Sequence, residues 1–190
     1  YNPDIVPENS SVYEVEVGRE IGQNSIVSVN VFDQAIDKPI VYGSTTGSNT
    51  YENGRSLGSR GAEAVFQRKA GAIDINVAYS NAVITSNEVP QYAVTGDDDN
   101  MLAFPTHKVT ALVTVTPMND LHITSSAMFV SERWTIKEVD SDGNPVYDKL
   151  DPSTLVNLHV LKRNAFAKGL DISGGVRNLF DEDFSFIPAY

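Results

Sequence analysis

The sequence has 190 residues and no cysteine, which excludes disulfide scaffolds, thiolate zinc sites and cysteine nucleophiles. Basic residues are scarce, since 14 Lys and Arg stand against 25 Asp and Glu and give a net charge of −11. This balance argues against a nucleic-acid-binding protein, which usually carries a basic patch. No apolar run approaches the roughly 18 residues of a membrane-spanning helix. A transmembrane β-barrel is not excluded, because its strands alternate lipid-facing and lumen-facing residues and have ordinary average hydropathy.

Signals for catalysis are also missing. The three histidines, His107, His122 and His159, fall in different segments and have no partner at metal-ligand spacing. No Gly-x-Ser-x-Gly elbow and no phosphate-binding glycine loop is present. The sequence therefore predicts no enzyme, no catalytic or metal-ligating residues and no bound cofactor.

What the sequence does contain is a strong period-two alternation. In each extended run one parity is apolar, as in Val27, Val29 and Val31, while the other parity carries polar residues such as Asn30. Charges on the apolar parity lie near the run ends, at Arg19, Asp33, Arg68, Arg133 and Lys162. An Arg or Lys facing lipid costs about 2–4 kcal/mol at the bilayer midplane and about 0–1 near the interface, so this placement suits a membrane wall. The eight runs cover residues 12–19, 25–33, 60–69, 72–81, 106–116, 121–134, 154–163 and 168–178.

A soluble antiparallel sheet with one buried face would show the same alternation. The connections between the runs favour the barrel, because short and long connections alternate along the whole chain. Outer-membrane barrels have short periplasmic turns and longer extracellular loops. Aromatic residues near the run ends suit the interfacial girdles of such a barrel: Tyr13, Phe32, Tyr79, Phe104, Trp134 and Phe180. We therefore expect an all-β fold, an antiparallel transmembrane β-barrel segment of about eight strands.

Two acidic segments are candidates for calcium, which prefers several oxygen ligands. One is Asp97-Asp98-Asp99-Asn100 in a long connection. The other runs from Asp140 to Asn144 and begins like a calcium-binding loop, but Pro145 replaces the required glycine and Asp151 stands where a glutamate is needed. A solvated turn is the stronger reading of both segments.

Three motifs resemble the barrels of TonB-dependent outer-membrane receptors. Asn-Pro-Asp-x-x-Pro-Glu at residues 2–8, followed by Tyr13-Glu14, is similar to a segment of those barrels. Residues 51–54, Tyr-Glu-Asn-Gly, lead to Gly61-Ala62-Glu63 and resemble the family's entry into a descending strand. Residues 176–181, Val-Arg-Asn-Leu-Phe-Asp, look like the family's motif near the penultimate strand. The three motifs occur in the family's order and span nearly the whole chain.

The resemblance implies a barrel of twenty-two strands around an N-terminal plug, in the bacterial outer membrane, which takes up a scarce ligand with energy from the TonB complex. The ligand of such a receptor would be a ferric chelate, a vitamin or a glycan. Residues 1–190 would then be one segment of the barrel, and the plug, the first part of the barrel and the final strand would be absent. The expected partners are outer-membrane lipid, the small-molecule or glycan ligand and, through the missing N-terminal region, the TonB complex; no nucleic acid is expected.

Two alternatives to this receptor reading stay open. The chain could be a complete eight-stranded outer-membrane barrel, or a soluble secreted β-sandwich that binds glycans. In the receptor reading the long connections carry recognition, because loops on a rigid scaffold usually do so. The candidate ligand-binding residues, chosen for aromatic and polar character, are Tyr92, Asp97, Asp98, Asp99, Asn100 and Trp134.

Overall fold

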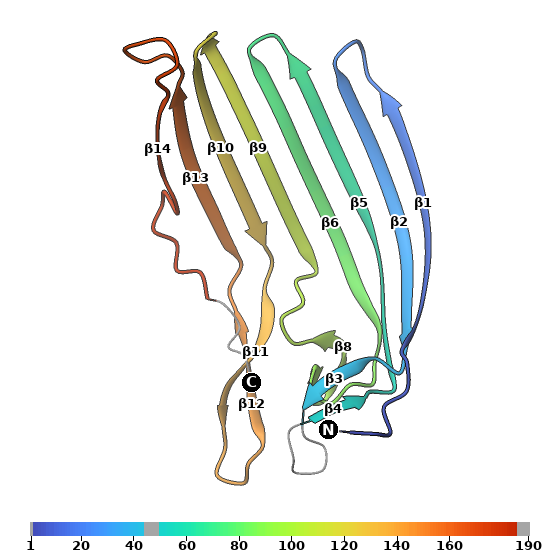
Figure 1. Cartoon of the computed structure of the whole chain (residues 1–190). Helices are drawn as coiled ribbons and strands as arrows, with labels where there is room; N and C mark the ends of the chain where they lie inside the picture. Colours follow the sequence, from blue (N-terminus) through green and yellow to red (C-terminus); the bar gives the residue numbers. More distant parts are fainter. Residues whose placement is uncertain (1, 44–49, 186–190) are drawn as a thin grey trace.

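The computed structural model describes residues 2–43 and 50–185, and within these it leaves the side chains of Asp98 and Asp99 undescribed. Eight antiparallel strands form one sheet, and their order in the sheet follows their order along the chain: β1-β2-β5-β6-β9-β10-β13-β14 (Figure 1). Over the described residues the secondary structure is all β, and no helix there is long and apolar enough to cross a membrane. The eight strands are β1 (Asn9–Glu20), β2 (Ser25–Asp37), β5 (Ser56–Ala70), β6 (Ile73–Asn87), β9 (His107–Met118), β10 (Leu121–Val130), β13 (Ser153–Lys162) and β14 (Ile172–Val176).

The strand register confirms the two faces that the alternation predicts. Residues paired across neighbouring strands lie on the same face of a sheet. One row of paired residues is apolar across six strands and consists of Val17, Val29, Ala64, Tyr79, Val109 and Phe129. The adjacent row on the other face is polar and consists of Glu16, Asn30, Glu63, Ser80 and Lys108.

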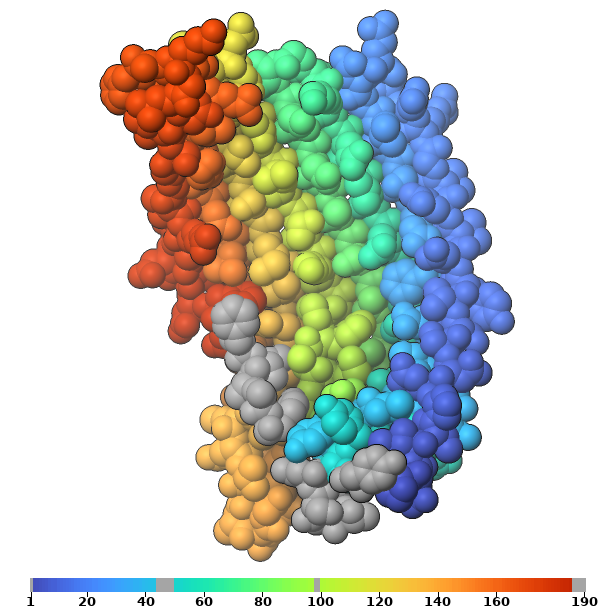
Figure 2. Space-filling model, viewed as in Figure 1, coloured from blue at the N-terminus to red at the C-terminus, as the bar shows by residue number. Residues whose placement is uncertain are grey.

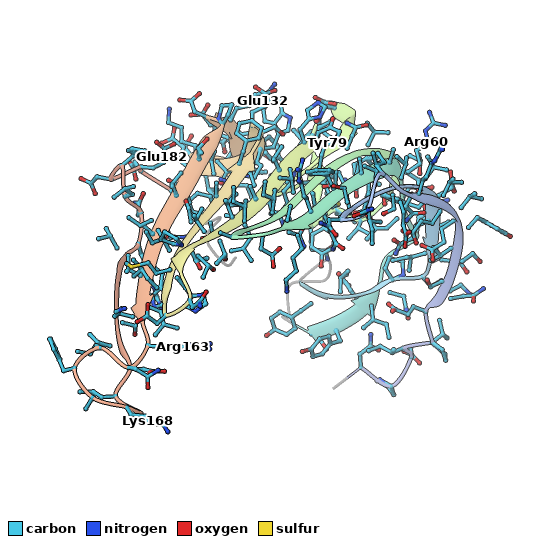
Figure 3. All side chains as sticks on the ribbon, turned by 90° about the horizontal axis from the view of Figure 1, so that it is seen from above. Arg60, Tyr79, Glu132, Arg163, Lys168 and Glu182 are labelled. Carbon is cyan, nitrogen blue, oxygen red and sulfur yellow. The ribbon has the colours of Figure 1, made fainter. Side chains whose placement is uncertain are left out.

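The sheet is strongly curved when it is seen along its strands (Figure 3). Arg60, which shares the face of the apolar rows through its pairing with Asp33, lies on the convex side in this view. The apolar face is therefore the outer face, and its valines are solvent-exposed: Val15 at 63% and Val31 at 49%. The concave, polar face is the inner wall.

A close contact between β2 and β5 depends on a glycine. Gly61 lies opposite Phe32, whose ring lies over the glycine on the inner wall. A side chain at this position would overlap the carbonyl oxygen of Asn81 and come within 2.9 Å of the Phe32 Cζ atom. Aromatic residues often cover strand glycines in this way. Gly61 therefore leaves room for the ring of Phe32 on the inner wall.

The long connections contain three small hairpins, all at the end of the sheet opposite the short turns (Figure 1). They are β3–β4 (Ile40–Gly43 and Thr50–Asn53), β7–β8 (Ala93–Val94 and Asp97–Met101) and β11–β12 (Arg133–Val139 and Pro145–Leu150). Figure 2 shows the inner face in space-filling form, with these segments gathered at one end. The buried apolar side chains of the described chain all lie here: Val41, Val89, Val94, Leu102 and Val130. We call this end the mouth.

Three strands, β2, β5 and β6, extend further toward the mouth than the expected runs 25–33, 60–69 and 72–81, and two expected strands are shorter in the structure. The run expected over 121–134 ends at Val130, and β11 of the third hairpin begins at Arg133. Between them, the regular strand pairing ends at Ser131, because the Ser131 hydroxyl accepts a hydrogen bond from the His107 amide at 3.1 Å. The last expected run, 168–178, is shorter as well, since β14 covers only Ile172–Val176.

Both alternatives to the barrel segment are wrong. A β-sandwich needs a second large sheet against the apolar face, yet the described residues form one eight-stranded sheet and three two-stranded hairpins. A complete eight-stranded barrel needs its first and last strands to pair. In the described residues β1 pairs only with β2 and β14 only with β13, so the sheet is open.

Candidate functional site

The mouth joins segments that are far apart in sequence. The Leu102 amide donates to the Tyr92 carbonyl at 2.9 Å, and Leu102 also forms a parallel β-bridge with Trp134. The next amide, that of Ala103, donates to the Trp134 carbonyl at 3.0 Å. Two of the predicted ligand-binding residues, Tyr92 and Trp134, are thus brought to either side of one buried leucine.

The sequence reading missed Asn87, which organises the β7–β8 hairpin. Its side-chain amide donates to the carbonyls of Tyr92 at 3.2 Å and Asn100 at 3.4 Å. Asn100 in turn donates to the carboxylate of Asp97 at 2.8 Å. The interaction holds together three of the predicted residues. Of the remaining two in this segment, Asp98 and Asp99, the backbone belongs to β8 but the side chains lie outside the described residues.

Trp134 carries a cation against its ring. The Lys149 Nζ atom lies 4.9 Å from the indole ring centre and also forms an ion pair with Glu132 at 2.7 Å. A cation over an aromatic face is attracted by the ring's quadrupole. One side of the indole is therefore occupied by Lys149, and a ligand would reach Trp134 from the other side or by displacing the lysine.

Two further contacts close the mouth. The hydroxyls of Thr95 and Tyr147 lie 3.1 Å apart and join the β7–β8 and β11–β12 hairpins. The Gln91 side chain donates to the Glu52 carboxylate at 2.6 Å and so reaches the β3–β4 hairpin. Since three hairpins are linked by side chains, the mouth is a packed unit rather than a set of separate loops.

The first two motifs of the family resemblance contact each other. Asn53 donates to the Val6 carbonyl and accepts from the Val6 amide, both at 2.9 Å. Asn2 adds a bond to the Tyr51 carbonyl at 3.0 Å. The segment before β1 is thereby fixed along the β3–β4 hairpin.

The third motif forms a turn after β14. Asn178 has a φ angle of 51°, the left-handed region that asparagine tolerates better than most residues. Its amide donates to the Asn157 side chain at 2.9 Å, and its own side chain bonds both to the Glu182 amide at 2.9 Å and to the Glu182 carbonyl at 2.8 Å. The asparagine of this motif therefore has a structural role.

The inner wall is lined by hydrogen-bonding side chains. Thr114 and Thr124 bond across β9 and β10 at 3.0 Å, and Asn157 donates to Ser126 at 3.1 Å. A hollow of about 200 Å³ is lined by Glu63, Lys108 and their neighbours. Glu63 lies on the inner wall, opposite Asn30.

The Asp140 segment is a hydrogen-bonded turn. One carboxylate oxygen of Asp140 accepts from the amides of Asn144 at 2.8 Å and Asp142 at 2.9 Å. The bond from the Asn144 amide is the main reason that the pKa of Asp140 lies below its usual value. Among the residues that the structure describes, no group of three or more His, Asp or Glu is arranged to hold a metal ion. The calcium expectation at residues 97–100 involves side chains outside that description.

A curved antiparallel wall with an apolar outer face, a polar inner face and all its long loops at one end defines part of a transmembrane β-barrel. The sequence matches the family described as "TonB dependent receptor-like, beta-barrel" over residues 1–179. The chain belongs to this family, and it is therefore a protein of the bacterial outer membrane.

Solved receptors share the fold at low sequence identity. The siderophore receptor PirA from Acinetobacter baumannii has a TM-score of 0.71 at 16% identity, with 94% of this chain and 28% of PirA covered. The ferric-catecholate import receptor Fiu from Escherichia coli K12 gives 0.68 at 16%, covering 95% and 24%. The ferripyoverdine receptor of the Pseudomonas aeruginosa outer membrane gives 0.67 at 14%, covering 92% and 24%. This chain thus spans about a quarter of the length of these receptors. No curated protein matches it.

Proposed function

We propose that this chain is the C-terminal part of the barrel of a receptor that takes up a ferric chelate with energy from the TonB complex. The observation that carries the proposal is the packed mouth, which places Tyr92, Asn100 and Trp134 together above a polar inner wall. The printed names of the similar solved proteins, which include a siderophore receptor and a ferric-catecholate import receptor, support an iron chelate over a vitamin or a glycan.

In this proposal the loop residues make the first contact with the ligand. Tyr92 and Trp134 supply aromatic surface, while Asp97, Asp98, Asp99 and Asn100 supply polar groups. The outer face binds membrane lipid, because its valines are exposed and unpartnered by protein in the described chain. The TonB complex acts through a region of the receptor that lies outside residues 1–190.

The test uses the full-length receptor that contains this chain, expressed in bacteria that lack their own iron receptors. We expect uptake of radioactive iron supplied as a chelate, and we expect no uptake in the same cells without TonB. Cobalamin and a maltooligosaccharide serve as the vitamin and glycan probes. Iron uptake that persists without TonB, or TonB-dependent uptake of only one of these other probes, would contradict the proposal.

Site residues are tested in the same cells with two aromatic substitutions. Trp134→Ala should weaken chelate binding, because Trp134 lies in the mouth. Phe166→Ala is the control, since Phe166 is 86% exposed and lies in the connection between β13 and β14, at the opposite end of the sheet. Equal loss of binding in both variants would show that aromatic residues at the mouth have no special role.

A further inference from the structure

An apolar pocket interrupts the polar inner wall directly below the mouth. Its volume is about 130 Å³. The apolar side chains that line it come from β2, β5, β6, β8 and the segment after β8: Ile36, Leu57, Ile84, Met101 and Phe104. Elsewhere the mainly polar inner wall carries scattered apolar residues such as Phe32 and Leu112, but here five apolar side chains meet around one hollow.

The strand register places the pocket on the inner wall. Ile36 pairs with Leu57, and Ser59 pairs with both Gln34 and Ile84. Gln34 and Ile36 have the same parity along β2 as Asn30, which lies in the polar inner row. The register between β5 and β6 shifts between Gly58 and Ser59, at the level of the pocket. Such β-bulges re-aim side chains and are common beside functional sites.

The size and lining of the pocket suit a single aromatic ring. A dry protein cavity of about 150 Å³ lined by aliphatic and aromatic side chains binds benzene. The pocket of this chain is slightly smaller and is open to the inside of the barrel, so one planar ring of a larger ligand fits while the rest remains outside. Phe104 can pack against a ring, and the thioether of Met101 makes favourable contacts with aromatic edges.

Polar groups stand at the same pocket. Gln34 and Ser59 are among its lining residues, although nearly all of the lining surface is apolar. Neither side chain makes a hydrogen bond to another described residue, so both are available to a ligand. A few polar groups among apolar walls are the usual arrangement in small-molecule sites, where they fix orientation. Gln34 and Ser59 can therefore help to orient a ring that the apolar walls hold.

The pocket is also continuous with the mouth. Met101 directly follows Asn100 in β8, and the Phe104 amide donates to the Met101 carbonyl at 3.3 Å. The segment that carries the predicted ligand-binding residues thus also forms the roof of the pocket. The pocket therefore lies at the end of the inner wall that is next to the mouth.

We infer that this pocket binds one six-membered aromatic ring of the transported ligand. The inference rests on the proposed function, because it names the chemical class of chelate that the receptor takes up. A ferric chelate that contains aromatic rings satisfies it, whereas a purely aliphatic chelate does not.

The direct test is photolabelling of the full-length receptor with 4-azidophenol, followed by peptide mapping. We expect the label on the peptide that contains Met101 and Phe104, and we expect phenol to compete with it more strongly than cyclohexanol. Ile84→Trp fills the pocket and should reduce this labelling by about tenfold, a change of about 1.4 kcal/mol in binding. Val83→Trp is the matched control, because Val83 pairs with Arg60 and lies on the outer face.

A second measurement separates this inference from the proposed function. Cells are given iron as the complex of 2,3-dihydroxybenzoate or of acetohydroxamate, which has no ring. The expected result is that Ile84→Trp reduces binding of the aromatic complex about tenfold and leaves the other complex unchanged. Label at the pocket without iron uptake would overturn the proposed function alone. Iron uptake with no label at the pocket would overturn the ring site alone. Iron uptake in which Ile84→Trp affects the two complexes equally would do the same.

Discussion

The side chain of Asn53 pairs with the backbone of Val6 as a neighbouring strand would, since it donates to the carbonyl and accepts from the amide at 2.9 Å each. The same amide nitrogen also donates to the Lys38 carbonyl at 2.9 Å. One asparagine therefore fixes the segment before β1 to the β3–β4 hairpin. It also explains why two motifs some 45 residues apart belong together.

Asn53→Asp should loosen this junction. The substitution keeps the acceptor for the Val6 amide but removes both donated bonds and puts a carboxylate against two carbonyl oxygens. A net loss of about 1–3 kcal/mol is expected where a hydrogen-bonded polar group is left unpaired. Limited proteolysis of the full-length receptor should then cut within residues 2–8 faster. Asn9→Asp, an exposed change within β1, should leave the rate unchanged, and equal cleavage in the two variants would contradict this role of Asn53.

Val31→Arg tests the assignment of the faces. Val31 lies on the outer face between Val15 and Ala62, so an arginine there should cost about 2–4 kcal/mol if the position is near the bilayer midplane. The neighbouring change Asn30→Arg places the same side chain on the inner wall and should cost much less. The two variants are compared by the amount of folded receptor in the outer membrane, which is measured from its heat-modifiable mobility in gels. The assignment fails if the Asn30 variant is the one that is lost.

Gly61→Ala should prevent normal pairing of β5 with β6. The added methyl group would overlap the Asn81 carbonyl oxygen, which belongs to the backbone and cannot move without breaking the ladder. Trimming the nearby ring with Phe32→Leu should therefore not rescue the variant. Gly18→Ala is the control, because its nearest neighbour would lie at an ordinary 3.4 Å. Thermal unfolding of the receptor in detergent measures the difference, and a normal melting temperature for Gly61→Ala would refute the packing argument.

Leu102→Ala should separate the hairpins of the mouth. Leu102 is 5% exposed and bridges to Trp134, and removal of a buried leucine side chain typically costs about 2–5 kcal/mol. Because the loss is confined to the mouth, we expect faster protease cleavage in the β11–β12 hairpin and weaker chelate binding, with the sheet intact. Leu112→Ala, at a position that is 47% exposed on the inner wall, should show neither effect.

The short turn between β9 and β10 should respond to acid. Asp120 pairs with Lys162, and the hydrogen bond from that lysine lowers the pKa of the carboxyl below its usual value. A depressed pKa means that the pair stabilises the fold above the unfolded-state pKa of about 3.9 and that this contribution disappears as the pH falls through the folded-state pKa. The melting temperature of Asp120→Asn should therefore lie below that of the wild type at pH 7 and meet it at low pH. Asp4→Asn, which leaves this ion pair intact, is the control, and a difference that does not change with pH would contradict the ion pair.

The wall of this protein could be predicted from the sequence because its pattern is local. Each strand meets lipid on one side and polar groups on the other, so alternation of residues such as Val29 and Asn30 records the environment directly. The pairing of Val29 with Val17 and Ala64 then follows from the order of the strands along the chain.

The mouth could not be predicted in the same way. The contact between Leu102 and Trp134 and the bond from Gln91 to Glu52 join residues 32 and 39 positions apart, and no sequence period specifies either contact. Asn87 was missed because its role lies in holding two backbone carbonyls, which requires knowledge of how the loop folds back. The candidate residues were therefore identified by composition, and only the structure shows which of them meet.

The concentration of buried apolar side chains at the mouth gives the two ends of the molecule different thermodynamics. Opening the mouth would expose Val89 and Leu102 to water, and exposure of apolar surface raises the heat capacity. The outer face of the wall instead contacts lipid tails rather than water, so its apolar side chains contribute little to this heat-capacity change. Calorimetry of the receptor should therefore assign the positive heat-capacity change to the hairpins, so that the mouth behaves on heating like a small water-soluble protein.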